Sequence, residues 1–194
     1  MQKIILKTAL KSLLGVIIAL ILAFGIASFG FPKSMAGICA DCGNYRFATS
    51  YASLRYTYTK SVDDLDVCAQ YSIFSGHDGN IVKFCGKLVD DKGFEGICEK
   101  RGDKSGDYKQ FIYGNLCAAQ YRRGDKQKAV DTAETAMEGV NGFPAGNAFV
   151  SLTLEVQKKS DKETATAILE IIEGNFEQTK TYEAVIAILQ EITA

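Results

Sequence analysis

The chain has 194 residues, of which 47% are apolar and 23% charged, and its formal net charge is −1. This size and composition suit one folded domain preceded by a targeting segment. The charge is unevenly distributed, because residues 1–33 contain four lysines and no acid, whereas residues 34–194 carry a net charge of −5. A mildly acidic domain lacks the positive field that nucleic-acid binding requires, so we expect no nucleic-acid partner.

The N-terminus has the pattern of a membrane anchor. Residues 1–11 are basic, and residues 12–31 contain no charged side chain. About 20 apolar residues can span a bilayer as a helix. Because the lysines lie mainly before this segment, we expect a single-pass protein with its N-terminus in the cytoplasm and residues 34–194 outside. Small residues also permit cleavage after Ala27 or Ala36, which would make the protein secreted.

The remainder divides into a linker and a helical domain. Residues 32–44, with Cys39 and Cys42, are assigned to the linker, and residues 45–194 to an extracytoplasmic all-α domain. The chain contains only two prolines and many Ala, Leu, Glu and Lys residues, a composition that favours helices.

The segment Tyr108–Gly139 is the clearest helical pattern. Two amphipathic helices are predicted on either side of a corner at residues 123–126. The apolar stripes of the two helices consist of Phe111, Ile112, Leu116 and Ala119, and of Ala129, Val130, Ala133, Ala136 and Met137. The alanines of the second stripe allow the two helices to approach closely.

Similar corners recur along the domain, near Ser61, Gly93, Gly124 and Ser160, at spacings of 32, 31 and 36 residues. Such spacings are typical of a helix-turn-helix solenoid. Five residues after each corner, the second helix needs a small or apolar side chain. Cys98, Ala129 and Ala165 satisfy this requirement, and the first repeat departs from it with Asp66.

This pattern over residues 45–173 resembles a divergent tetratricopeptide-like repeat family. The resemblance implies a right-handed superhelix of about four helical hairpins. Residues 181–194 have an apolar stripe on one helical face, formed by Val185, Ile188, Leu189 and Ile192, and are predicted to be the capping helix. The resemblance also implies a docking surface for a protein or peptide partner. The alternative is an irregular helical bundle without true repeats.

Six cysteines in an exported domain predict disulfide bonds. In an antiparallel hairpin, residues equidistant from the loop face each other, which predicts bridges Cys68–Cys85 and Cys98–Cys117. The remaining Cys39 and Cys42 form a Cys-Ala-Asp-Cys motif. A local structural disulfide is the favoured interpretation, and a redox-active pair or a zinc site remains an alternative.

We therefore expect a membrane-anchored, non-catalytic interaction scaffold without cofactor or metal. The alternatives are a thiol–disulfide redox protein using Cys39 and Cys42, and a purely structural cell-envelope component. The only histidine, His77, is expected to lie in a solvent-exposed loop. The first helix of each hairpin lines the inner face of such solenoids, and its candidate partner-binding residues are Tyr58, Lys83, Lys87, Tyr121 and Arg122.

Overall fold

The computed structural model describes residues 2–102, 106–137, 148–174 and 182–194, with side chains from residue 11 onward. Every regular element in these ranges is a helix. The helices are α1 (Gln2–Gly30), α2 (Pro32–Asp41), α3 (Tyr45–Thr59), α4 (Val62–Ser75), α5 (Asp78–Val89), α6 (Phe94–Lys100), α7 (Asp107–Arg122), α8 (Lys126–Met137), α9 (Ala148–Lys159), α10 (Lys162–Gly174) and α12 (Glu183–Thr193). The all-α prediction is therefore confirmed for the described residues.

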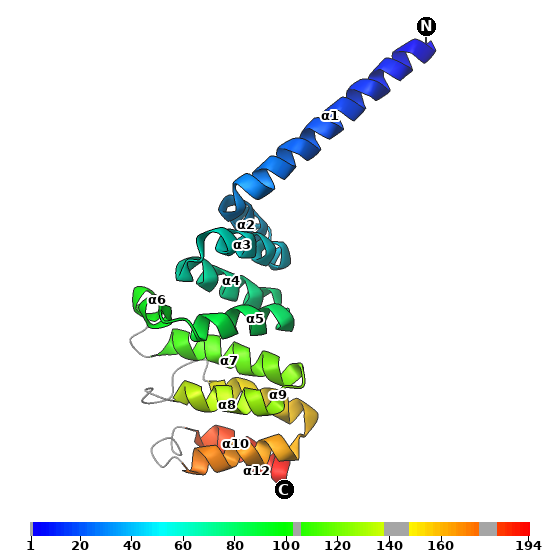
Figure 1. Cartoon of the computed structure of the whole chain (residues 1–194). Helices are drawn as coiled ribbons and strands as arrows, with labels where there is room; N and C mark the ends of the chain where they lie inside the picture. Colours follow the sequence, from blue (N-terminus) through cyan, green and yellow to red (C-terminus); the bar gives the residue numbers. More distant parts are fainter. Residues whose placement is uncertain (1, 103–105, 138–147, 175–181) are drawn as a thin grey trace.

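Helix α1 projects away from the rest of the molecule, and the other helices stack in successive tiers beneath it (Figure 1). Its segment Lys11–Gly30 is long and apolar enough to cross a membrane. Leu20, Ile26 and Phe29 are each more than 60% exposed. Water does not favour such an apolar surface, so α1 requires a lipid or protein environment.

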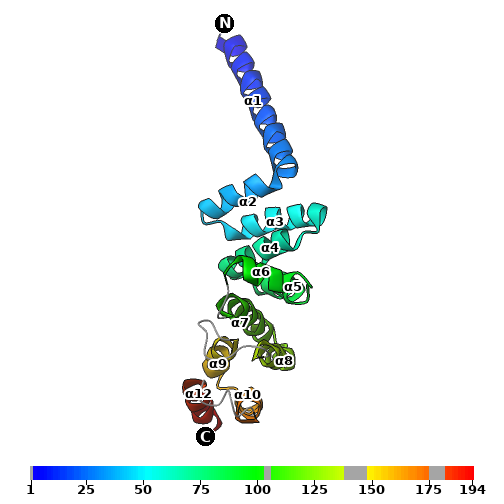
Figure 2. The same cartoon turned by 90° about the vertical axis from the view of Figure 1, so that its left-hand side faces the viewer.

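The segment assigned to a linker contains helix α2 instead. Pro32 starts the helix at a position where its missing N–H costs nothing. Pro32 and Ala36 are buried, and α2 lies directly against α3 (Figure 2). The Ser28 and Tyr51 hydroxyls lie 3.1 Å apart and link α1 to α3. Helix α1 therefore joins the folded stack directly through α2.

The four predicted corners are confirmed. Ser61 caps α4 by accepting a hydrogen bond from the Asp63 N–H at 3.2 Å, and Gly93 directly precedes α6. Gly124 separates α7 from α8 with φ +96°, a conformation that glycine adopts without a steric cost. Ser160 takes up a left-handed conformation between α9 and α10, with φ +48°.

The C-terminal half has a regular arrangement in which α7 and α9 run in the same direction. Buried Gln110, near the start of α7, donates to the Ala136 carbonyl at the end of α8. Its Oε1 accepts from the Ala148 N–H at the start of α9, at 3.1 Å. At the other end, Arg122 of α7 reaches Glu155 of α9. The pair α7–α8 is therefore followed by a second pair, α9–α10, whose first helix lies alongside α7 in the same direction.

The predicted capping segment closes the C-terminal half. Val185, Leu189 and Ile192 of α12 are buried, as the apolar stripe predicted. The ring of Phe149 in α9 meets the ring of Tyr182, just before α12, with centroids 5.6 Å apart. Residue 181, where the capping segment was predicted to begin, lies outside the described residues.

The N-terminal half departs from a uniform repeat because α6 has only seven residues. A helix of this length does not carry the chain back across the stack, so α7 starts at the end where α5 finishes. Asp78 at the start of α5 consequently pairs with Arg122 at the end of α7. Helices α5 and α7 are therefore antiparallel, whereas α7 and α9 are parallel.

Asp66 of α4 is only 4% exposed and stabilises this irregular connection. Its carboxylate accepts hydrogen bonds from Arg101 at 2.5 Å, from Gln70 at 2.9 Å and from the Tyr108 hydroxyl. The Arg101 guanidinium also lies over the Tyr108 ring, 4.6 Å from its centroid. A buried carboxylate with these partners satisfies its hydrogen-bonding capacity, which explains an acid where a small residue was expected.

Candidate functional site

A groove of about 140 Å³ lies between α5, α7 and α8, and we call it the α5–α8 groove. It is lined by Val82, Gly86, Val89, Asp90, Tyr113, Leu116, Gln120, Lys128, Thr132 and Thr135. Gly86 leaves the α5 wall open, because a Cβ atom added there would meet no heavy atom within 4 Å. Across the groove from this glycine, α7 contributes Tyr113, Leu116 and Gln120.

Gln120 of α7 is the polar group that distinguishes the α5–α8 groove. The residue is 2% exposed, and its Oε1 has no hydrogen-bond partner among the described parts of the chain. A buried acceptor without a partner costs roughly 1–3 kcal/mol. A ligand that donates a hydrogen bond to this amide oxygen would remove that cost, so the groove is suited to a ligand with an N–H or O–H group.

Two opposite charges lie along the groove. Asp90 ends α5 and Lys128 lies in the first turn of α8, and both line the groove with exposed side chains. Neither forms an ion pair with any residue that the structure describes. Charges of opposite sign on one groove favour a ligand with a matching polarity and a defined direction.

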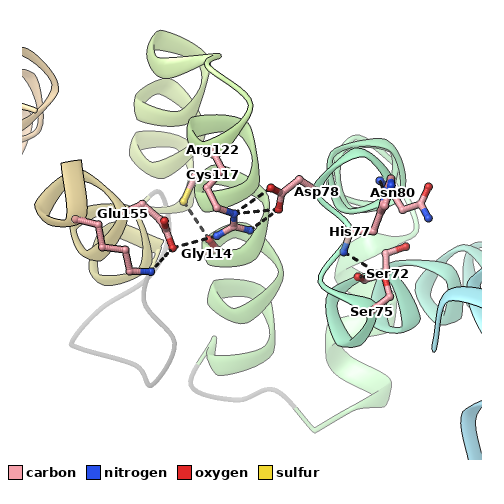
Figure 3. A network of polar contacts seen from close by, with 10 residues as sticks. Ser72, Ser75, His77, Asp78, Asn80, Gly114, Cys117, Arg122 and Glu155 are labelled. Carbon is pink, nitrogen blue, oxygen red and sulfur yellow. Dashed lines mark hydrogen bonds and ion pairs between the residues drawn. The ribbon is translucent and has the colours of Figure 1, made fainter. Parts of the chain in front are cut away.

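A polar network next to the groove holds three helices together (Figure 3). Arg122 of α7 pairs with Asp78 of α5 at 2.6 Å and with Glu155 of α9 at 3.1 Å. Glu155 also pairs with Lys158 at 2.8 Å. Because Arg122 bridges α5 to α9 through α7, this network fixes one end of the groove.

His77 lies beside this network and is exposed, as expected. Its Nδ1 accepts a hydrogen bond from the Asn80 N–H at 3.2 Å, so the imidazole caps the N-terminus of α5. This position explains why α5 begins at Asp78. The contact is structural and needs no catalytic role for the histidine.

The candidate partner-binding residues divide into two groups. Tyr58 of α3 and Lys83 and Lys87 of α5 are exposed. Tyr121 is fully buried, and its hydroxyl donates to Asp161 at 2.8 Å. Arg122 is held in the polar network.

Tyr121 is therefore a correction to the predicted surface, whereas Arg122 is exposed and remains a prediction. The corner between α9 and α10 covers the C-terminal end of α7, which a helical pattern for α7 alone does not reveal. The residues that line the groove instead include Gly86 and Gln120. Gly86 is a small residue seven positions before the corner at Gly93, a spacing that could have singled it out, whereas no sequence feature marks Gln120.

No disulfide bond links the six cysteines in the structure. The proposed Cys98–Cys117 pair does not fit the helix geometry. Phe94 of α6 meets the Tyr113 ring at 6.3 Å, and Glu95 pairs with Lys109 at 2.8 Å. These contacts place Cys98 near the first turn of α7, roughly 12 Å along the helix from Cys117.

The Cys117 thiol instead approaches the carbonyls of Gly114 and Ala148, each at 3.3 Å. The Cys117 side chain, on α7, is therefore packed against α9. Cys68 and Cys85 are buried on the adjacent antiparallel helices α4 and α5, so their pairing remains a prediction.

Cys39 and Cys42 lie at the C-terminal end of α2, where Cys42 is the cap residue. The negative pole of a helix dipole lies at this end and disfavours a thiolate, whereas reactive Cys-X-X-Cys pairs use a helix N-terminus. This position disfavours the redox alternative. Among the described residues, no three His, Cys, Asp or Glu side chains gather closely enough to hold a metal ion.

No protein-family model, curated protein or solved structure matches this chain.

Proposed function

We propose that this chain is a membrane-anchored, non-catalytic binding module that holds a segment of a partner protein in the α5–α8 groove. The observation that carries the proposal is Gln120, which lines an open groove and whose buried Oε1 has no hydrogen-bond partner among the residues that the structure describes. A side-chain amide can bond to the backbone N–H of an extended peptide. The exposed Asp90 and Lys128 would then select the direction of that peptide.

The anchor in this proposal is α1. Its apolar segment Lys11–Gly30 carries exposed side chains over its length. Lys3 and Lys7 precede the span and Lys11 begins it, which favours a cytoplasmic N-terminus and a stack outside the cytoplasm. The direct connection from α1 to α2 would hold the groove at a fixed height above the bilayer.

We also propose a tetratricopeptide-like geometry for the C-terminal half alone. The parallel α7 and α9, each followed by an antiparallel second helix, support this assignment. Helices α2–α6 would then act as an adaptor between the anchor and the repeats. Repeat stacks present long surfaces with little enclosed volume, which suits docking.

Site-specific photo-crosslinking in intact membranes tests the proposal. A photoreactive amino acid at Thr135, which lines the groove, should capture a partner, and the same group at Glu134 should not. Both positions are exposed and adjacent on α8. They differ mainly in the direction in which the side chain leaves the helix.

The variant Gly86→Leu supplies the specificity test. The added side chain enters open space and should occupy the groove without disrupting the fold. It should abolish the crosslinks from Thr135. Equal crosslinking from Thr135 and Glu134, or crosslinks that survive Gly86→Leu, would contradict the proposal.

A further inference from the structure

A second cavity lies in the first tier of the stack, where α2, α3 and α4 meet. Its volume is about 190 Å³. Small residues create it: Ala36 and Gly37 on α2 face Ala52 on α3, with Val67 and Tyr71 of α4 across from them. A Cβ atom added at Gly37 would meet nothing within 4 Å, so this wall is open. The cavity therefore has largely apolar walls.

The charged residues of the cavity leave one cation in excess. Arg55 Nε donates to Asp64 at 2.7 Å, and the Thr59 hydroxyl donates to the same carboxylate at 2.6 Å. Burial acts to raise the pKa of Asp64, but these hydrogen bonds and the charges of Arg55 and Lys33 outweigh it and lower the pKa. Arg55 therefore balances the charge of Asp64.

Lys33 is the remaining cation. It lines the cavity and makes no ion pair with any residue that the structure describes. A cation at the edge of an apolar cavity complements an amphiphile with a negative headgroup.

The cavity lies next to the end of the apolar helix. Helix α1 ends at Gly30 and α2 begins at Pro32, and both views show α2 directly below the end of α1 (Figures 1 and 2). Each residue extends a chain by at most about 3.8 Å. Lys33 is three residues after Gly30 and therefore lies within roughly 12 Å of the end of α1. If α1 spans a bilayer, this distance places Lys33 at the level of the lipid headgroups.

We propose that this cavity binds one anionic lipid from the adjacent leaflet, with an acyl segment against Ala36, Ala52 and Val67 and the headgroup at Lys33. The proposal rests on the membrane span of α1 and is independent of the α5–α8 groove. A bound lipid would fill the joint between the anchor and the stack.

The test uses the full-length protein in nanodiscs that contain equal amounts of phosphatidylcholine and phosphatidylglycerol. After extraction into mild detergent, native mass spectrometry counts the lipids that remain bound. One phosphatidylglycerol per chain is expected. Lys33→Gln should reduce the preference for phosphatidylglycerol roughly fivefold, which corresponds to about 1 kcal/mol for one lysine near a lipid surface.

Gly37→Leu should remove the retained lipid altogether, because its side chain occupies the cavity. Gly96→Leu is the matched control, since Gly96 is exposed on α6 and its Cβ position is also open. Lys87→Gln on α5 controls for a lost surface charge. Circular dichroism melting establishes that each variant is folded.

Three outcomes would overturn the proposal. Lipid retention that is unchanged in Gly37→Leu would show that lipid only surrounds α1. Equal retention of phosphatidylcholine would remove the role of Lys33. Displacement of the bound lipid by free glycerol phosphate, which has no acyl chain, would show that the cavity binds a soluble anion. Crosslinking from Thr135 is read separately, so failure of the lipid site and failure of the groove are distinguishable.

Discussion

The two halves of the stack pack their helices by different means. In the C-terminal half, fully buried small residues such as Ala129, Ala133 and Ala165 let helices approach, and Gln110 satisfies the backbone groups between them. In the N-terminal half, a buried ionic network at Asp66 stabilises a short helix and a reversal of direction. The regular repeats pack mainly through small residues and satisfied backbone groups, whereas the irregular connection is built around a buried charge and its partners.

Thiol reactivity gives the largest expected contrast, between exposed and buried cysteines. Cys42 is exposed, whereas Cys68, Cys85 and Cys117 are fully buried. Burial raises the pKa of each of these three thiols to about 12. In native, reduced protein at pH 7, N-ethylmaleimide should modify Cys42 roughly a hundredfold faster or more, because the buried thiols react only after opening.

Unfolding in urea is the control, and it should make all these thiols react alike. Rapid native modification of Cys117 would contradict the packing of α7 against α9. Non-reducing peptide mapping of protein from its own compartment should find no peptide that joins Cys98 to Cys117. It also tests the remaining Cys68–Cys85 and Cys39–Cys42 predictions.

Removing a large side chain should damage the C-terminal half most. Phe149 is fully buried in α9, so Phe149→Ala should lower the free energy of unfolding by about 3–5 kcal/mol, through lost burial and a cavity. Urea unfolding followed by circular dichroism measures this loss. Leu154→Ala on the same helix is the control, since Leu154 is 46% exposed, and it should change stability by under about 1 kcal/mol. Equal losses would contradict the assigned face of α9.

The Asp66 network should be the corresponding weak point of the N-terminal half. Asp66→Leu removes the carboxylate that accepts from Arg101 and Tyr108 and should cost about 3 kcal/mol. The loss lies at the lower end of the range for a broken buried ion pair, because Arg101 is 38% exposed and water can solvate it.

A triple variant separates charge from shape in this network. Asp66→Leu with Arg101→Met and Tyr108→Phe replaces the carboxylate and two of its partners by apolar residues, and it leaves the half-buried Gln70 in place. The triple variant should recover most of the lost stability, since apolar replacement of a buried ion pair is often neutral. A triple variant that is as unstable as Asp66→Leu would show that the network is needed for the fold itself.

The sequence predicted the features that depend on local chemistry. The corners followed from glycine, serine and polar caps such as Ser61, and the apolar stripes of α7, α8 and α12 followed from helical periodicity. The helix α2 was missed because Pro32–Asn44 has small and mixed residues with no clear stripe. Its helical state depends on packing against α3.

The direction of α7 and the groove could not be predicted. They depend on where α6 ends, and that end is fixed by a contact between Asp66 and Arg101, which are 35 residues apart. The same contact shifts Cys98 away from Cys117. Gln120 was missed because it stands out only through the hydrogen-bond partner that its buried Oε1 lacks among the described residues. A sequence pattern does not reveal which side-chain atoms are left without partners in the fold.

The smallest expected effect concerns Tyr121, at the joint between the two C-terminal corners. Its hydroxyl donates to Asp161, which also accepts from Lys126 at 2.7 Å and from Thr164 at 2.9 Å. Burial acts to raise the pKa of Asp161, but the hydrogen bonds from Lys126, Tyr121 and Thr164 outweigh it and hold the pKa well below its usual range. Tyr121→Phe should cost about 1 kcal/mol at pH 7.

The pH dependence follows from this depressed pKa. A carboxylate with a lowered pKa stabilises the folded state above its unfolded pKa of about 3.9, and this contribution is lost as the pH falls toward the folded value. The native chain and Tyr121→Phe should therefore both lose stability as the pH falls below about 4, and the difference in unfolding free energy between them should narrow only as the pH falls through the depressed folded pKa, where protonation removes the charged acceptor from both. Urea unfolding from pH 7 down to the lowest pH at which the native chain stays folded measures it, with Tyr58→Phe as the control because Tyr58 is 62% exposed. A difference that stays constant below the folded pKa as well would mean that Tyr121 acts through packing alone, and the C-terminal corners would then depend mainly on shape.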